Sequence, residues 1–196
     1  MTLNDLSSPL SLLETRRSGR PREMVAPGPS AAELTRILTI AARTPDHGKL
    51  APWRFVVVSS EQRDALADLL ARALPESVAE AGLAHFQKAH DFAHQAPTLV
   101  VLVAAPIADH KIPLWEQELS VGAAAMNLLS AAHALGYVGG WISSWAAYSD
   151  QVRAAFCAPG ERIAGFMFLG SPGVALQERP RPALADVVRQ WTPPEA

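Results

Sequence analysis

Residues 43–58, RTPDHGKLAPWRFVVV, place a short polar loop between two apolar segments. Before the loop, residues 31–42 repeat apolar side chains at helical spacing, and the run FVVV after it is aromatic and β-branched, as in a strand. The loop carries Arg43, His47 and Lys49, and two prolines restrict its backbone. Clustered cations repel one another unless a carboxylate such as Asp46, or a bound anion, relieves them. An anionic ligand is the favoured interpretation.

Length and composition describe one globular unit. The chain has 196 residues, of which 49% are hydrophobic, and this is ample for a packed core. We expect a single domain over residues 1–196, with an extended proline-rich tail from about residue 172. A net charge of -2 and a pI near 6.3 give no general attraction to nucleic acid or to anionic membrane. Any anion site must therefore be local.

Cysteine content and apolar runs bear on the cellular compartment. Cys157 is the one cysteine of the chain, which excludes an internal disulfide and a zinc site built from several cysteines. The apolar run at 96–108 is too short to span a membrane, and the run at 119–135 is interrupted by polar residues. The first residues lack the basic and apolar regions of a secretory signal. We predict a cytoplasmic protein without a membrane span.

A second basic cluster closes the first predicted helix. Ser8 and a following proline suit a helix start, and the apolar pattern continues to about Arg17. The sequence RRSGR then places Arg16, Arg17, Ser18 and Arg20 within five residues. A solvated helix end favoured by the helix dipole explains the cluster, and taken alone this interpretation is favoured. A phosphate clamp explains it too, because guanidinium groups match phosphate oxygens.

The remaining elements follow from periodicity and from turn residues. Ser30 and Glu33 have the spacing of a capping box at the start of the second helix. The small residues of the helix expected over 114–135 indicate that it is enclosed, in the core or against a partner subunit. Predicted strands cover 54–58, 98–104 and 162–169, predicted helices cover 61–73, 75–94 and 150–156, and a glycine-led segment, GGWISSW, covers 139–145. The two glycines permit close approach of a flat group, or merely a tight turn.

Three histidines fall in the helical stretch 75–94. His90 and His94 are one helical turn apart, a spacing that suits metal binding, and His85 precedes them. No cysteine or nearby glutamate completes a ligand set, although Asp91 lies between the two. A solvated helix face is the favoured interpretation, and we predict no metal.

Five motifs in order resemble the FMN-dependent nitroreductase family, specifically its small single-domain branch. They are RRS at 16–18, PDHxxxxPW at 45–53, WEQE at 115–118, GGWxS at 139–143, and GFxxLG at 165–170. The motifs extend over nearly the whole chain. The resemblance implies an α+β fold with a central mixed β-sheet flanked by helices, and an intertwined homodimer that binds FMN at its interface.

The resemblance also implies chemistry and site residues. NADH or NADPH reduces FMN, and a nitroaromatic or quinone-type acceptor reoxidises it by ping-pong hydride transfer. Family motifs place the FMN contacts on Arg16, Arg17, Ser18, Arg20, Arg43, His47, Lys49, Trp141, Ile142 and Ser143. Lys49 stands where many larger members have asparagine. A segment linked to the nicotinamide nucleotide corresponds to Ala131, Ala132, His133, Ala134, Leu135 and Gly136. No catalytic side chain is expected, because the flavin carries the reaction.

Other functions stay open at this point. The same fold could act on another acceptor or on the flavin itself, since a fold does not set a substrate. A non-enzymatic dimer that binds flavin for storage or sensing would carry the same binding residues. A nucleic-acid-binding module built on the basic clusters is disfavoured by the acidic balance of the chain. No motif fixes the physiological acceptor or the choice between NADH and NADPH. The family also uses a basic residue near the C-terminus to hold the phosphate, and no motif decides between Arg179 and Arg181 for that role.

Overall fold

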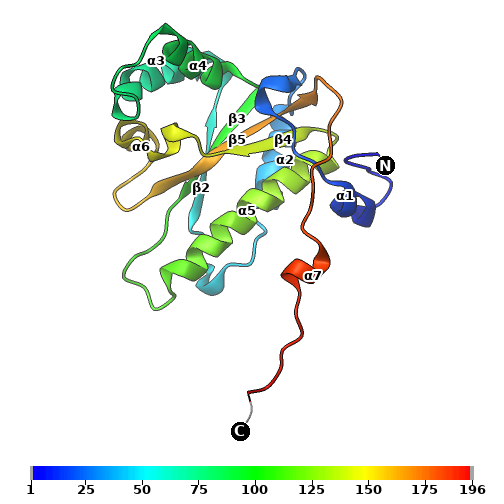
Figure 1. Cartoon of the computed structure of the whole chain (residues 1–196). Coiled ribbons are helices and arrows are strands. Elements are labelled where there is room, and N and C mark those ends of the chain that lie inside the picture. Colours follow the sequence, from blue (N-terminus) through cyan, green and yellow to red (C-terminus); the bar gives the residue numbers. More distant parts are fainter. Residues whose placement is uncertain (1, 195–196) are drawn as a thin grey trace.

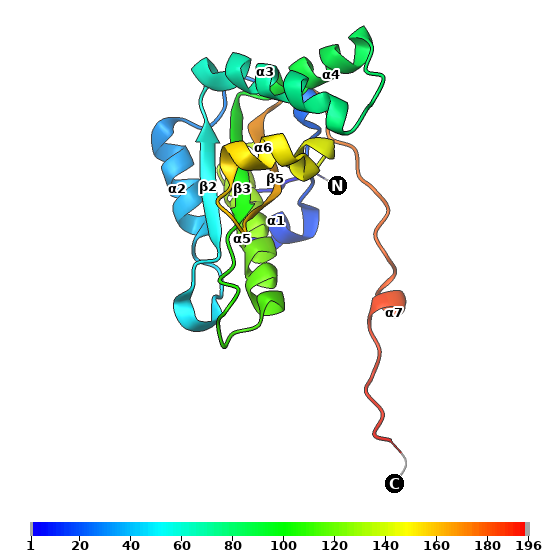
Figure 2. The ribbon, with the colours of Figure 1, turned by 90° about the vertical axis from the view of Figure 1, so that its left-hand side faces the viewer.

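A computed structural model describes residues 2–194. One β-sheet lies between two layers of helices, and the C-terminal segment extends away from this body (Figures 1 and 2). The strands are β1 (Met24–Val25), β2 (Trp53–Val58), β3 (Thr98–Ala104), β4 (Val138–Ile142) and β5 (Arg162–Pro172). The helices are α1 (Pro9–Thr15), α2 (Ala31–Ala41), α3 (Arg63–Ala73), α4 (Leu83–His94), α5 (Leu114–Ala134), α6 (Asp150–Phe156) and α7 (Leu184–Val187). The expected α+β fold is confirmed.

The sheet is antiparallel in every pairing among residues 2–194, so the expected mixed sheet is wrong for the described chain. β5 is central: residues 166–169 pair with β3 and β4 at once, so these two strands lie on opposite sides of it. β2 extends the sheet beyond β3, and β1 pairs with the last two residues of β5. The connection through α5 does leave β3 and β4 pointing the same way. Their parallel pairing is prevented because β5 inserts between them.

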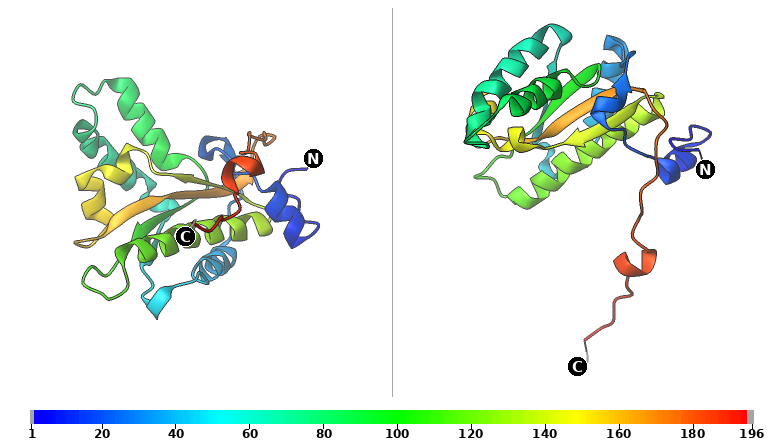
Figure 3. Two further views of the ribbon diagram at one scale, coloured as in Figure 1. Left: turned by 60° about the horizontal axis from the view of Figure 1, so that its bottom comes forward. Right: turned by 45° about the horizontal axis from the view of Figure 1, so that its top comes forward.

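Alternation along β3 divides the core into two clusters, one on each face of the sheet (Figure 3). Leu99, Val101 and Val103 pack in a cluster with residues of α3, α4 and α6. Val100 and Leu102 pack in a cluster with residues of α2 and α5. β3 is therefore buried on both faces, as its unbroken apolar sequence predicts.

Helix α5 runs along the sheet and has two different faces. Its buried face includes Val121, Ala125 and Leu128, which pack on the α2 side of the sheet. On another face, Trp115 and Leu119 are 67% and 52% exposed. The core therefore covers only one face of this helix, although its small residues predicted that it is enclosed.

Three boundaries differ from the sequence predictions. The helical stretch expected over 75–94 is broken, since α4 begins only at Leu83 after Gly82. α1 ends at Thr15, two residues before Arg17, and Arg16 is already extended. β5 continues to Pro172 because β1 supplies a partner for its last residues. The Gly-Ser-Pro sequence at 170–172 indicated a turn, but this long-range pairing prevails.

The tail, residues 173–194, forms no helix or strand apart from the single turn α7. Its first part, residues 174–180, lines a cavity beside the loop that follows α1. Beyond that point the tail leaves the body (Figures 1 and 2), and Leu184, Val187 and Trp191 are between 64% and 79% exposed. Apolar side chains are thus presented to the surroundings without cover from the same chain.

Candidate functional site: an arginine loop, a glycine strand and a distant cationic loop

The arginine loop, residues 16–20, is held in place by its neighbours on both sides. Ser8 caps α1 by accepting a hydrogen bond from the Ser11 amide at 3.0 Å, so the helix starts where the sequence predicts. The Asn4 side chain accepts from the Arg17 amide at 2.7 Å and donates to the Arg17 carbonyl at 3.1 Å. The Gly19 amide donates to the Gly139 carbonyl at 3.2 Å, which fixes the loop against β4.

The C-terminal tail returns to this loop and brings another arginine to it. Arg17 Nε donates to the Gln177 carbonyl at 2.7 Å, and an Nη of Arg181 donates to the Arg16 carbonyl at 3.3 Å. The loop and the tail enclose a cavity of about 530 Å³. Its lining includes Arg17, Ser18, Gly19, Arg20 and Arg179. Three of the sequence-predicted cofactor residues therefore face one space.

The cluster has more positive charge than its carboxylates balance. Within residues 2–194, Arg20 pairs with Glu23 and Arg181 with Glu178, whereas Arg16 and Arg17 have no carboxylate partner within 4 Å. Burial, together with the charges of Arg181 and Arg17, lowers the pKa of Arg16. A bound dianion reverses these unfavourable contributions. The arrangement therefore suits a phosphate group.

The glycine strand β4 lies directly beside the arginine loop. A Cβ at Gly140 would lie 3.0 Å from the Gly19 carbonyl oxygen, so the loop and the strand approach too closely for a larger residue. Trp141 donates from Nε1 to the Ala164 carbonyl at 3.0 Å and covers Gly165, where a Cβ would lie 2.1 Å from the indole nitrogen. The Trp141 side chain stays 43% exposed, and Ile142 and Ser143 are partly exposed next to it. The exposed indole of Trp141 thus lies on the face of β4 opposite to the one that Gly140 turns toward the arginine loop.

His133 supports this junction from inside the core. It is fully buried, and its Nε2 accepts from the Gly139 amide at 3.2 Å. Nδ1 has no hydrogen-bond partner among the described residues. Burial, helped by the charge of Arg16, lowers the pKa of His133 to about 4, so the ring is neutral near pH 7. His133 therefore positions the glycine strand and through it the arginine loop.

Burial restricts the segment expected to meet the nicotinamide nucleotide. Ala131, Ala132 and His133 are at most 3% exposed and belong to the core, so their side chains offer no surface to a ligand. Ala134, Leu135 and Gly136 keep accessible surface. Gly136 also lines a cavity of about 650 Å³, together with residues 172–176.

The loop at 43–52 is attached to α5. His47 Nδ1 lies 2.6 Å from a carboxylate oxygen of Glu116, and the Ser120 hydroxyl donates to the Pro45 carbonyl at 2.9 Å. Asn127 donates to the Thr44 hydroxyl at 2.9 Å. Gly48, Lys49 and Ala51 have positive φ, so the backbone turns sharply at the tip. Arg43, His47 and Lys49 are all exposed.

These two groups of residues lie far apart on one chain. The arginine loop meets β4 at Gly139, which pairs with Leu169 of β5. The cationic loop leads into Trp53, which pairs with Ala104, itself paired with Arg162 of β5. Leu169 and Arg162 are seven residues apart on β5, which corresponds to about 23 Å along the strand. Across the sheet, β4 and β2 are a further three strand spacings apart. The structure thus brings the arginine loop, residues 16–20, to the start of β4 and leaves His47 and Lys49 at the opposite end of the sheet. Arg43 lies between the two, where Asn127 of α5 approaches its carbonyl.

Sequence reasoning missed several contributors. Arg181 follows a proline in a tail without regular structure, and no local pattern shows that it returns to Arg16. Asn4 accepts a hydrogen bond from the amide of Arg17, 13 residues later in the chain. Asn127 donates one to the hydroxyl of Thr44, 83 residues earlier. Only the family resemblance pointed to a C-terminal cation, and it left Arg179 and Arg181 equivalent.

Within residues 2–194, no helix is both long enough and apolar enough to cross a bilayer. The sequence profile of the Nitroreductase family matches residues 13–171. A protein of Haemophilus influenzae named "Putative NAD(P)H nitroreductase" is 38% identical over 174 residues, covering 87% of this chain and 91% of the relative. The Escherichia coli K12 protein "Putative NAD(P)H nitroreductase YdjA" is 36% identical over 164 residues, covering 83% and 87%.

Solved structures show the same fold at lower sequence identity. A nitroreductase-like family protein from Bacillus cereus aligns with a TM-score of 0.78 at 19% identity, over 93% of this chain and 95% of its own. A nitroreductase with bound FMN from Bacteroides fragilis aligns with a TM-score of 0.69 at 22% identity, over 91% and 96%. The profile match spans most of the chain, including the arginine loop and the glycine strand. The chain belongs to the nitroreductase family.

Proposed function

We propose that the protein is an FMN-dependent oxidoreductase that uses NADH or NADPH to reduce nitroaromatic or quinone-type acceptors, and that it works as a homodimer. The observation that supports this proposal best is the arginine cluster: Arg16 and Arg17 are partly buried without carboxylate partners among residues 2–194, and Arg17 lines a cavity of about 530 Å³. A phosphate dianion balances that charge. The relatives named as NAD(P)H nitroreductases support the reaction class.

The residues present suit FMN at both of its ends. Arg16, Arg17 and Ser18 would hold the phosphate and the ribityl chain, with Arg181 as a further cation. Trp141, Ile142 and Ser143, which keep accessible surface at the end of β4, would line the flat ring. Bound FMN supplies the redox chemistry, because it accepts a hydride from the nicotinamide and passes electrons to the acceptor. The chain itself then has to bind, orient and stabilise charge.

The distance between the two cationic loops supports a dimer. If His47 and Lys49 contact the same flavin as Arg16, they come from a second copy of the chain, because the loop tip of the same copy lies at the opposite end of the sheet. The exposed apolar residues Trp115 and Leu119 on α5, and those of the tail, suit the contact between copies. Each flavin site would therefore combine residues of both subunits.

Absorption spectroscopy of the purified protein tests the proposal directly. With FMN supplied in excess and the unbound part removed, we expect a yellow protein with two flavins per dimer. Anaerobic NADH or NADPH should bleach the flavin absorption, and a nitroaromatic or a quinone should restore it. A folded protein that stays colourless contradicts the flavin site. Flavin binding without reduction by either nicotinamide would indicate a storage or sensing protein instead.

A further inference from the structure

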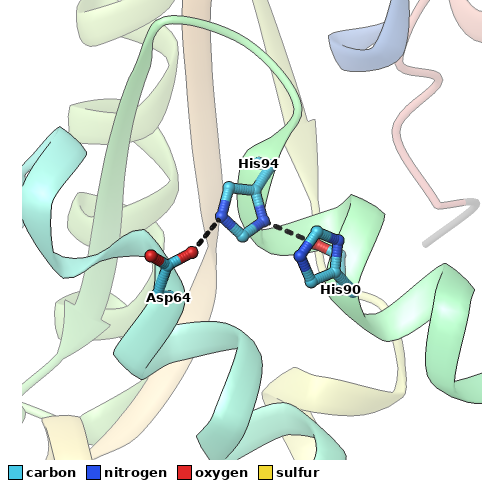
Figure 4. A group of neighbouring side chains, drawn as sticks. All are labelled: Asp64, His90 and His94. Carbon is cyan, nitrogen blue, oxygen red and sulfur yellow. Dashed lines mark hydrogen bonds and ion pairs between the residues drawn. The ribbon is translucent and has the colours of Figure 1, made fainter.

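Helices α3 and α4 pack side by side and bring three potential metal ligands together. Leu66 and Leu70 of α3 belong to the same core cluster as Ala89 and Ala93 of α4. This packing places Asp64, in the first turn of α3, against His90 and His94 at the end of α4 (Figure 4). One ligand atom from each of the three lies within 4.8 Å of the others.

Both ring nitrogens of His94 face hydrogen-bond acceptors, so a neutral ring leaves one of these two contacts without a proton. Nδ1 lies 2.9 Å from the His90 carbonyl oxygen, and Nε2 lies 2.9 Å from Oδ1 of Asp64. Both partners are acceptors, and a neutral imidazole has a single N–H to donate. When Nδ1–H donates to the carbonyl, the Nε2 lone pair faces a carboxylate oxygen. A second proton or a cation between Nε2 and Asp64 is needed to make that contact favourable.

The orientation of His94 is the one that metal-binding histidines adopt. In such sites one ring nitrogen donates to a carbonyl or carboxylate, which fixes the tautomer and aims the other nitrogen at the ion. His90 stands one turn earlier on the same helix, and its ring lies 4.3 Å from that of His94 at an interplanar angle of 22°. Asp91 adds negative charge, with Oδ1 at 3.7 Å from Nδ1 of His90. Two imidazoles and a carboxylate therefore converge on one side of α4.

The distances require little rearrangement to admit an ion. Bonds of 2.0–2.1 Å in a tetrahedral zinc site put ligand atoms about 3.3 Å apart. The contact between His94 and Asp64 is already 2.9 Å. The Asp64 and His90 side chains are 92% and 57% exposed, so both are free to turn toward an ion. Water would complete the coordination on this open side.

We propose that Asp64, His90 and His94 form a binding site for a divalent transition metal, with Zn²⁺ as the ion that this donor set suits. The ion would link the first turn of α3 to the last turn of α4. The site is separate from the cavity beside Ser18, since none of its three ligands lines that cavity. It is therefore independent of the proposed flavin chemistry. No metal is predicted from the sequence, since no cysteine or nearby glutamate completes a ligand set and Asp64 lies 26 residues before His90.

Isothermal titration of the full-length, tag-free, chelator-treated protein with zinc chloride tests this site. We expect one Zn²⁺ per chain and a rise in melting temperature with zinc concentration, because binding to the folded state stabilises it. His94→Ala and Asp64→Asn should each weaken zinc binding at least about tenfold. The control is His85→Gln, which removes an exposed histidine of the same helix outside the cluster and should leave zinc affinity unchanged.

Circular dichroism of each variant checks that the helices remain folded, and His90→Ala provides a third independent ligand removal. Absence of stoichiometric zinc binding by the unmodified protein overturns the proposal. Zinc binding that survives His94→Ala and Asp64→Asn overturns it as well, and identifies His94 and Asp64 as a simple ion pair between a protonated ring and a carboxylate.

Discussion

Arg16 and Arg181 lie close together, and the repulsion between their positive charges is unfavourable in the protein without a ligand. Arg16→Ala should weaken FMN binding by about 1.5–3 kcal/mol, because a charge-assisted bond to the phosphate is lost. Arg181→Ala should weaken it about tenfold, since Arg181 is more exposed and already pairs with Glu178. Fluorescence titration of FMN, which is quenched or enhanced on binding, measures both affinities.

Arg189→Ala is the matched control for the two arginine variants. Arg189 lies in the tail beyond α7, is exposed, and does not line the cavity beside Ser18. Its removal changes the net charge by the same amount as Arg181→Ala, so FMN affinity should stay at the wild-type value. Equal losses in all three variants would show a general charge effect and would remove Arg16 and Arg181 from the site.

His133 should make folding stability depend on pH. Its pKa is about 4 when folded and 6.5 in the unfolded chain, so between these values only the unfolded chain binds the proton. Stability should therefore be unaffected by this ring above pH 6.5 and should fall as pH drops from 6.5 to 4, by about 3 kcal/mol in total. Urea unfolding at several pH values measures the slope.

His133→Gln separates this contribution from that of the carboxylates. Glutamine keeps an acceptor for the Gly139 amide but binds no proton in this range. The variant should be less stable at neutral pH, yet lose less additional stability between pH 6.5 and 5. An unchanged slope in this range would mean that His133 is not buried as a neutral ring.

Helix α2 begins at a capping box that also reaches β4. The Ser30 hydroxyl accepts from the Glu33 amide at 3.3 Å, and the Ser30 amide donates to the Glu33 carboxylate at 2.9 Å. Tyr137 donates to the same carboxylate at 2.9 Å. Ser30→Ala should cost about 1 kcal/mol of stability, which corresponds to a melting temperature lower by about 2–4 °C. Thermal unfolding measures the shift, and Thr35→Ala, on the exposed middle of the helix, should change it much less.

Elements whose boundaries depend on local signals are well predicted from sequence. The apolar run of β3 gives its limits, Thr98–Ala104, and the caps at Ser8, Ser30 and Ser149 mark three helix starts. β5 was predicted too short because β1, more than a hundred residues earlier, extends it. Its insertion between β3 and β4, which makes the sheet antiparallel, is likewise a long-range effect that no local pattern records.

For the candidate site too, local motifs could be predicted from the sequence and long-range contacts could not. The family motif RRS pointed to Arg17 and Ser18, and both line one cavity in the structure. Burial of Ala131, Ala132 and His133 is a property of the packed core, and the small residues of α5 did not reveal which side faces inward. The choice between Arg179 and Arg181, and the pairing of Asp64 with His94, could not be predicted because each depends on a partner far away in the chain.

The separation of the two cationic loops makes a prediction about assembly. Arg16→Ala and His47→Ala, each alone, should lower the flavin content of the purified protein. If one flavin site takes Arg16 from one subunit and His47 from the other, a mixed dimer of the two variants has one site with both changes and one site with neither. After unfolding and refolding of an equal mixture, about one quarter of all sites should be intact.

Flavin content and NAD(P)H oxidation of the refolded mixture check this expectation, with each variant refolded alone as the control. Recovery to about one quarter of the wild-type value requires sites shared between subunits, since no intact site exists in either variant by itself. If both residues act within one chain, every site in the mixture keeps a defect and no recovery follows. Leu119→Asp places a charge on the exposed apolar face of α5, so it should reduce both the dimer fraction in light scattering and the recovery.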